Sequence, residues 1–146
     1  MAPVLRRFLL LLLALGLLGS GVELLLLEHT ETLIQWLPLL MIVVALVACG
    51  SMAFRPTRGK VRAFRAVMVL LIGTGTLGLI QHYQGNMEFE LEMRPTMGGL
   101  ELFRESMMGA TPALAPGMIA HLGLLGLVLT YGHPARARRN EEEPEE

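Results

Sequence analysis

The amino-acid sequence predicts an all-α integral membrane protein, a four-transmembrane-helix bundle with a short strand-plus-amphipathic-helix cap between the third and fourth spans. Four apolar segments lie at about residues 8–27, 33–54, 63–82 and 112–132. Each segment has roughly the 20 residues that cross a hydrocarbon core of about 30 Å. Hydrophobic residues make up 53% of the chain and charged residues 17%, a balance typical of membrane proteins. The connections between the segments also differ in charge: some are basic and the others acidic, and this difference predicts how the chain is oriented in the membrane.

Ten of the twelve Lys and Arg residues flank the inner ends of the predicted spans: Arg6, Arg7, Arg55, Arg58, Lys60, Arg62, Arg65, Arg136, Arg138 and Arg139. Because basic residues stay on the cytoplasmic side of short loops, both termini are predicted to be cytoplasmic. The composition is rich in arginine, poor in lysine and free of aspartate, which favours a bacterial inner membrane. A net charge of −1 gives no sign of nucleic-acid binding.

The first segment also has features of a signal peptide, because Arg6 and Arg7 precede a leucine-rich run that ends near Gly19-Ser20-Gly21. The apolar run resumes at Val22, which favours an uncleaved span. The second segment contains Cys49, the single cysteine, and a small buried residue is the simpler interpretation of it.

The third and fourth segments carry small residues at helical spacing. Gly75 and Gly78 share a face in the third span, and Gly123 and Gly126 share one in the fourth. Small residues let helices approach closely in lipid. These four glycines therefore predict helix packing, either within the bundle or against a homo-oligomer or a larger membrane complex.

The outer cap is predicted over residues 84–110. Residues 87–93 alternate strictly between apolar and acidic side chains, which indicates a half-buried strand. Leu100, Phe103 and Met107 then predict a short amphipathic helix over 100–108. Residues 135–146 lack apolar patterning, and we expect a disordered cytoplasmic tail.

Ionisable side chains on the outer side are the candidates for a site. His29, His82 and His121, with Glu23 or Glu88, could supply a transition metal such as copper or zinc. His82 and His121 could alternatively hold a haem axially. The spacing lacks the i, i+4 histidine pair of a strong metal motif, so structural roles for these residues remain the simpler alternative.

No catalytic motif accompanies these residues, so the sequence favours a protein that is not an enzyme. The leading hypothesis is a structural or accessory membrane subunit that presents its acidic outer cap to a partner. The second hypothesis is the metal or haem site. The third is a proton or ion pathway through Glu23 and His121, since ionisable groups at membrane depth are costly.

Overall fold

The computed structural model describes residues 2–54, 56–109 and 114–137. Within these ranges the chain forms six helices and no strand. The helices are α1 (Pro3–Leu26), α2 (Trp36–Ala53), α3 (Arg58–Met93), α4 (Gly99–Met108), α5 (Gly117–Leu129) and α6 (Pro134–Ala137). The predicted all-helical core is therefore confirmed, whereas the strand is not.

Three helices are long and apolar enough to cross a membrane, namely α1, α2 and α3. Helices α1 and α2 agree broadly with the first two predicted spans. Helix α3 contains the third predicted span and continues well beyond its C-terminal end, to Met93. The fourth apolar helix, α5, has 13 residues and rises only about 20 Å, against the 112–132 predicted from sequence. Residues 112 and 113 lie outside the described ranges. The fold is thus an all-helical bundle in which three helices have the length and apolar composition of membrane spans.

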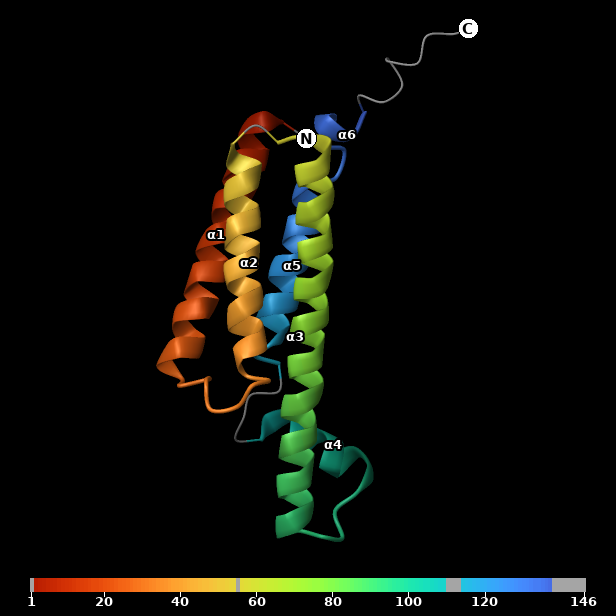
Figure 1. Cartoon of the computed structure of the whole chain (residues 1–146). Coiled ribbons are helices and arrows are strands. Elements are labelled where there is room, and N and C mark those ends of the chain that lie inside the picture. Colours follow the sequence, from red (N-terminus) through yellow and green to blue (C-terminus); the bar gives the residue numbers. More distant parts are fainter. Residues whose placement is uncertain (1, 55, 110–113, 138–146) are drawn as a thin grey trace, which may run out of the picture.

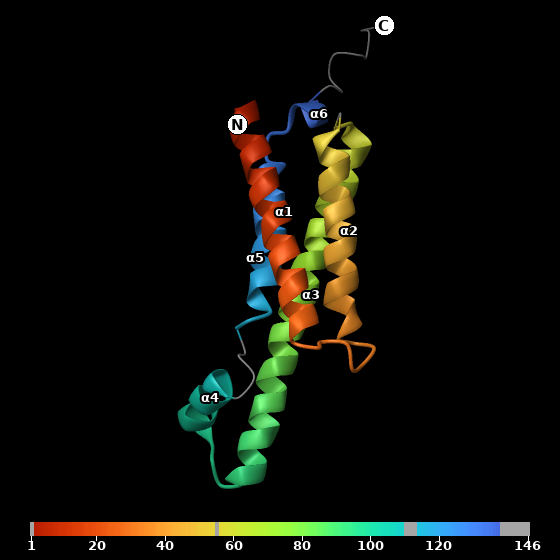
Figure 2. The same cartoon turned by 90° about the vertical axis from the view of Figure 1, so that its left-hand side faces the viewer.

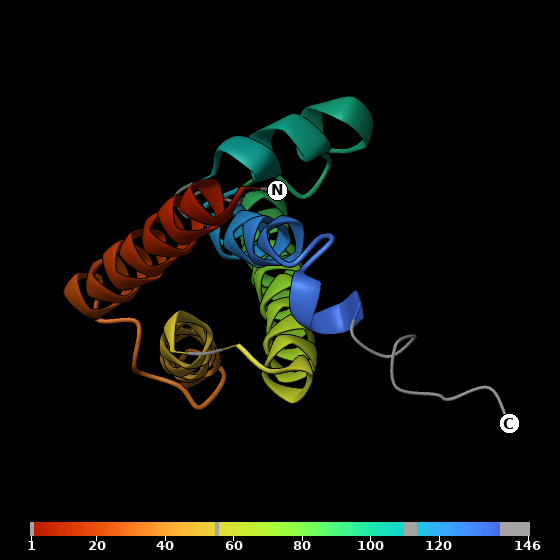
Figure 3. The same cartoon turned by 90° about the horizontal axis from the view of Figure 1, so that it is seen from above.

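The bundle packs its helices as antiparallel neighbours along the chain (Figure 1). Helix α3 contacts both α2 and α5, while α1 completes the arrangement by contacting α2 and α5. Figure 3 shows α1 leaning away from the α3–α5 pair when the bundle is seen from above. The start of α1, the connection between α2 and α3, and α6 all lie at one end of the bundle (Figures 1 and 2).

The side chains at the centre of the bundle are apolar and come from every long helix. Leu13 and Leu17 of α1 meet Phe64, Met68 and Leu71 of α3 in one buried cluster, and all five have no exposed surface. Much of the remaining apolar surface is exposed in the single chain. Exposing so much apolar surface is unfavourable in water and is favourable in the hydrocarbon core of a membrane.

The four glycines predicted to pack helices all lie where α3 meets α5. A Cβ atom at Gly75 would lie 2.5 Å from the backbone nitrogen of Ala120, and one at Gly78 would lie 2.9 Å from the Pro116 Cβ. Gly123 and Gly126 belong to α5 and lie against α3. A Cβ at Gly123 would lie 2.7 Å from the Met68 carbonyl oxygen, and one at Gly126 would meet the Met68 thioether. The small-residue faces are therefore used inside the chain: Gly75 and Gly123 lie against the backbone of the other helix, and Gly78 and Gly126 lie against its side chains.

The predicted strand over residues 87–93 is wrong, because α3 continues without a break to Met93. Met, Glu and Leu are strong helix formers, and Arg94 adds a charged hydrogen bond to Glu90 one turn back. The residues that turn toward α4 recur at helical spacing, with Tyr83 and Asn86 making side-chain contacts to that helix. The amphipathic helix predicted over 100–108 is confirmed as α4. The outer cap is therefore a helical hairpin, residues 81–109, which projects beyond the other helices (Figure 2).

Side-chain hydrogen bonds fix the end of the bundle at which α3 begins. The Thr57 hydroxyl accepts a hydrogen bond from the Lys60 backbone nitrogen at 3.4 Å and so caps α3. Arg65 donates to the buried Thr130 hydroxyl at 3.1 Å and joins α3 to the end of α5. In the predicted disordered tail, the first three residues belong to α6, which begins at Pro134. The rest of that tail, 138–146, lies outside the described residues.

Candidate functional site

The candidate site lies at the end of the bundle that carries the helical hairpin, where the connection between α1 and α2 meets α3. Helix α1 ends in a Schellman motif, with Glu28 in the left-handed region at φ 51°. The His29 backbone nitrogen donates to the Leu24 carbonyl at 3.0 Å, and the Glu28 nitrogen donates to the Leu25 carbonyl at 3.1 Å. The sequence therefore places His29 at a defined position immediately after the helix.

The rest of this connection is held by the first residues of α2. The Gln35 side-chain oxygen accepts hydrogen bonds from the backbone nitrogens of Glu31 and Thr32, at 2.7 and 3.0 Å. The Trp36 indole nitrogen donates to the Thr30 carbonyl at 3.1 Å. These bonds satisfy backbone groups locally, so the connection is a structured loop.

His29 and His82 are the two predicted site residues that the structure brings together. Their ring centres lie 6.4 Å apart, and the ring planes are tilted by 57°. Both side chains are half-buried. Burial, and then the neighbouring His82, lower the pKa of His29 below its usual value of 6.5. At neutral pH the His29 imidazole is therefore uncharged and has a lone pair on one ring nitrogen.

The other predicted ligands lie apart from this pair. His121 is exposed on α5, and its Nδ1 donates to the Gly117 carbonyl of its own helix at 2.7 Å. Glu23 and Glu88 are exposed on α1 and α3, and no hydrogen bond or ion pair joins Glu23 to His121. Within the described ranges, no group of three or more His, Cys, Asp or Glu side chains gathers to hold a metal. The three-histidine metal or haem site, like the ion pathway, therefore stays a prediction.

The hairpin beside this site is held by an aromatic and a polar contact. Tyr83 of α3 and Phe103 of α4 lie with ring centres 5.9 Å apart. The buried Asn86 side chain donates to the Ser106 carbonyl at 2.9 Å. The Ser106 hydroxyl is fully buried and has no hydrogen-bond partner. These contacts make α4 part of the folded structure and not a loose surface helix.

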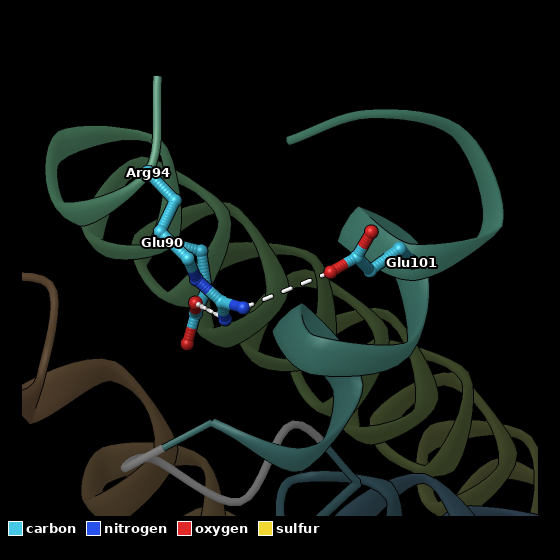
Figure 4. A network of polar contacts seen from close by, with 3 residues as sticks. All are labelled: Glu90, Arg94 and Glu101. Atoms are coloured by element: carbon cyan, nitrogen blue, oxygen red, sulfur yellow. Dashed lines mark hydrogen bonds and ion pairs between the residues drawn. The ribbon is translucent and has the colours of Figure 1, made fainter. Parts of the chain in front are cut away.

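An ion-pair network closes the far end of the hairpin (Figure 4). Arg94 donates to Glu90 at 2.6 Å and lies 3.7 Å from a carboxylate oxygen of Glu101. The hydrogen bond to Glu90 raises the pKa of Arg94 above its usual value. The network thus links α3 to the start of α4 across the turn between them.

Two residues of this hairpin, Asn86 and Ser106, were not among the sequence candidates. For Asn86 the reason is the period of two, which assigns residues 87–93 to a strand and leaves Asn86 before it in a loop; Ser106 lies in a predicted helix, but its partner is 20 residues away. Reading the same segment at a period of 3.6 places Tyr83, Asn86 and Glu90 on one face, and that face is the one that meets α4.

An apolar groove of about 550 Å³ runs between the C-terminal part of α1 and the N-terminal part of α2. Hydrophobic side chains between Leu17 and Leu25 and between Trp36 and Leu46 line it, together with Gly21. Its lining is compatible with contact to lipid chains.

The fold and these features define the chain as an all-helical protein with apolar helices suited to a membrane. Compared with known proteins, the chain matches no protein family, no curated protein and no solved structure at a significant level.

Proposed function

We propose that this chain is a small polytopic protein of the bacterial inner membrane that acts as a structural or accessory subunit. It crosses the membrane four times, keeps both termini in the cytoplasm and presents the helical hairpin to a partner on the outer side. The observation that carries the proposal is the hairpin itself, a folded acidic projection that leaves apolar side chains exposed.

The fourth crossing is supported by the turns at both ends of α5. The backbone nitrogens of Gly117, Met118 and Ile119 donate to carbonyls three residues earlier, beginning at Leu114. Similar turns carry the coil on to Tyr131, before Gly132 at φ 57° ends it. The coiled path from 114 to 131 has 18 residues and rises about 27 Å, close to the thickness of a hydrocarbon core.

The orientation is supported by the position of the basic residues. The start of α1, the connection between α2 and α3, and α6 lie at the same end of the bundle (Figure 1). Arg6, Arg7, Arg58, Lys60 and Arg62 fall at that end of the chain's helices. Positive charge near the ends of spans marks the cytoplasmic side. The opposite end, with the hairpin, is then extracytoplasmic.

The surface of the hairpin supports a partner of basic and apolar character. Residues 81–109 contain five glutamates and two arginines, a difference of −3. Apolar side chains on this projection are more than half exposed: Phe89, Met93, Leu100, Phe103 and Met108. Exposed apolar side chains with charges around them are typical of protein interaction surfaces. The acidic rim would steer a basic partner and repel a second copy.

Within the membrane, His121 supports a second contact with the same or another partner. Its side chain is exposed on α5 between Met118 and Leu124, which are exposed as well. Ionisable residues at membrane depth normally face a protein interior or a water-filled cavity and not lipid. A neighbouring helix that covers this face of α5 would satisfy that tendency.

Site-specific photo-crosslinking in intact cells tests the proposal. A photoreactive residue at Leu100 is expected to capture a partner protein, whereas one at Val47, exposed on α2 in the apolar region, serves as the control. Reversing the exposed charges at Glu88 and Glu92 to lysine should reduce the yield at Leu100 at least several-fold. Products at Leu100 that contain only lipid or a second copy of the chain would contradict the proposal.

A further inference from the structure

Three basic side chains from different elements lie around the end of α5, and we call Arg6, Arg65 and His133 the basic cluster. Arg65 of α3 donates from a terminal nitrogen to the Thr130 hydroxyl at 3.1 Å, and the His133 backbone nitrogen donates to the Thr130 carbonyl at 3.2 Å. Burial and then the charge of Arg6 lower the pKa of His133, which places the Arg6 guanidinium near the same point. Helices α1 and α3 begin and α5 ends at this end of the bundle (Figure 2).

Arg6 carries a charge that the described part of the chain does not neutralise. Its side chain is half-buried, and its Nε is shielded from solvent without a hydrogen-bond partner. The sequence has no aspartate, and the glutamates in the described ranges lie only within 23–31 and 88–105, toward the opposite end. A guanidinium that is partly removed from water is costly unless an anion pairs with it.

The dipole of α5 offsets only part of the charge in the basic cluster. The C-terminal end of a helix carries about half a negative elementary charge. Arg6 and Arg65 together carry two positive charges, so more than one positive charge remains. The bond to Thr130 uses only one of the five N–H donors of Arg65. The cluster therefore has the charge and the hydrogen-bond donors that a phosphate group requires.

Apolar side chains continue from the basic cluster along two helices. Phe8 and Leu12 of α1 and Val128 of α5 are exposed and lie within about two turns of the cluster. A ligand that suits both features carries an anionic phosphate joined to hydrocarbon chains. Basic pockets between membrane helices bind the headgroups of anionic lipids in this manner.

We propose that the basic cluster binds the phosphate of an anionic phospholipid, with Arg6 and Arg65 as its two guanidinium ligands. The acyl chains lie along the exposed apolar surface of α1 and α5, and the bound headgroup joins α1 to α3 across the end of α5. The inference rests on the membrane location in the proposed function and not on a partner at the hairpin. Failure to capture a partner at Leu100 therefore leaves it intact.

Native mass spectrometry of the full-length chain measures lipid binding, with equal amounts of phosphatidylglycerol and phosphatidylcholine in the micelles. The native chain is expected to retain phosphatidylglycerol in preference to phosphatidylcholine. Arg6→Gln should weaken phosphatidylglycerol binding by about tenfold, the effect of losing one hydrogen bond between charged groups. Arg7→Gln, which removes the same charge from the exposed neighbour on α1, is the matched control and should bind like the native chain. On α3, the exposed Arg62 provides the same control for Arg65→Gln.

Thermal unfolding gives a second measurement that needs no variant. Phosphatidylglycerol added to phosphatidylcholine micelles is expected to raise the unfolding temperature by several degrees, and an equal concentration of inorganic phosphate should not. Equal stabilisation by inorganic phosphate would overturn the lipid as the source of the phosphate. Equal losses in Arg6→Gln and Arg7→Gln would overturn the site, because attraction would then be spread over the whole basic surface.

The acidic residues near the C-terminus are a competing occupant that the same assay detects. Residues 141–146 contain five glutamates and lie outside the described ranges. Phosphatidylglycerol binding that appears only after these five are replaced by glutamine would assign the basic cluster to them and overturn the proposal. Binding that is already present in the native chain supports it.

Discussion

A single methyl group added at Gly75 is expected to separate α3 from α5. The new Cβ would lie 2.5 Å from the Ala120 backbone nitrogen and 2.9 Å from the Pro116 carbonyl oxygen. Both are backbone atoms at the start of α5, so neither can rotate away. Since unstrained contacts lie at about 3.5 Å or more, the two helices must move apart by about 1 Å.

The cost follows from the loss of packing along this interface. Overpacking a close contact costs about 1–3 kcal/mol, and a gap of 0.5–1 Å already removes about a quarter to a half of each dispersion contact. Alanine is a better helix former than glycine by up to about 1 kcal/mol, which acts in the opposite direction. Gly73→Ala isolates this opposing term, because nothing lies within 4 Å of a Cβ at Gly73. The difference between the two variants should therefore be about 1–3 kcal/mol.

Reversible unfolding of the full-length chain in mixed micelles measures this difference directly. Gly75→Ala should unfold more readily than the native chain, and Gly73→Ala should unfold like it or less readily. Gly123→Ala provides a second test from the other helix, because its Cβ would lie 2.7 Å from the Met68 carbonyl oxygen. Equal stability of the Gly75 and Gly73 variants would refute the backbone-to-backbone packing of α3 and α5.

Three further predictions concern the two ends of the bundle. Glu28→Gly should stabilise the chain by about 1 kcal/mol in the same unfolding assay, because a side chain at φ 51° is strained and glycine is not; a loss of stability would contradict this. Asn86→Ala should lower the free energy of unfolding by about 1–3 kcal/mol and increase amide exchange in α4, because it removes the hydrogen bond to the buried Ser106 carbonyl. Ser106→Ala removes a buried hydroxyl that has no hydrogen-bond partner, so it should leave the stability unchanged or raise it. At the opposite end of the bundle, burial and Arg6 lower the pKa of His133, so stability should fall as pH drops below 6.5, and His133→Gln should flatten that dependence; an unchanged pH profile in the variant would count against it.

Long apolar segments were the most predictable part of the fold. Residues 8–27 and 33–54 are predominantly hydrophobic, and no period or partner is needed to assign them as helices. The glycines at 75, 78, 123 and 126 were also identifiable, because small residues at helical spacing have few other uses. Which helix they would contact was not predictable, since that depends on how the chain folds back over some 40 residues.

The outer hairpin was harder to predict because two periods compete in a short segment. Seven residues from Met87 to Met93 alternate perfectly, yet their helix propensity and the Glu90–Arg94 pair continue the preceding helix. The contact of Asn86 with Ser106 crosses 20 residues and leaves no local signal.

The site was predictable only in its residue types. His29 and His82 were two of several candidate ligands predicted from the sequence, and the structure brings their ring centres to 6.4 Å. His121 lies on α5, where its Nδ1 donates a hydrogen bond to the Gly117 carbonyl one turn earlier. Depth along a span can be estimated from sequence, but the direction in which a side chain points around the helix depends on packing, and here it separates His121 from the pair.

Accessibility of single cysteines in intact cells tests the central claim, a four-span bundle with the hairpin outside, most directly. In a Cys49→Ala background, cysteines replace Glu92 in the hairpin, Gly59 at the start of α3 and the exposed Tyr131 after α5. A membrane-impermeant maleimide should label position 92 in intact cells, and positions 59 and 131 only after permeabilisation. Labelling of position 131 from outside would mean three crossings, and would contradict the account.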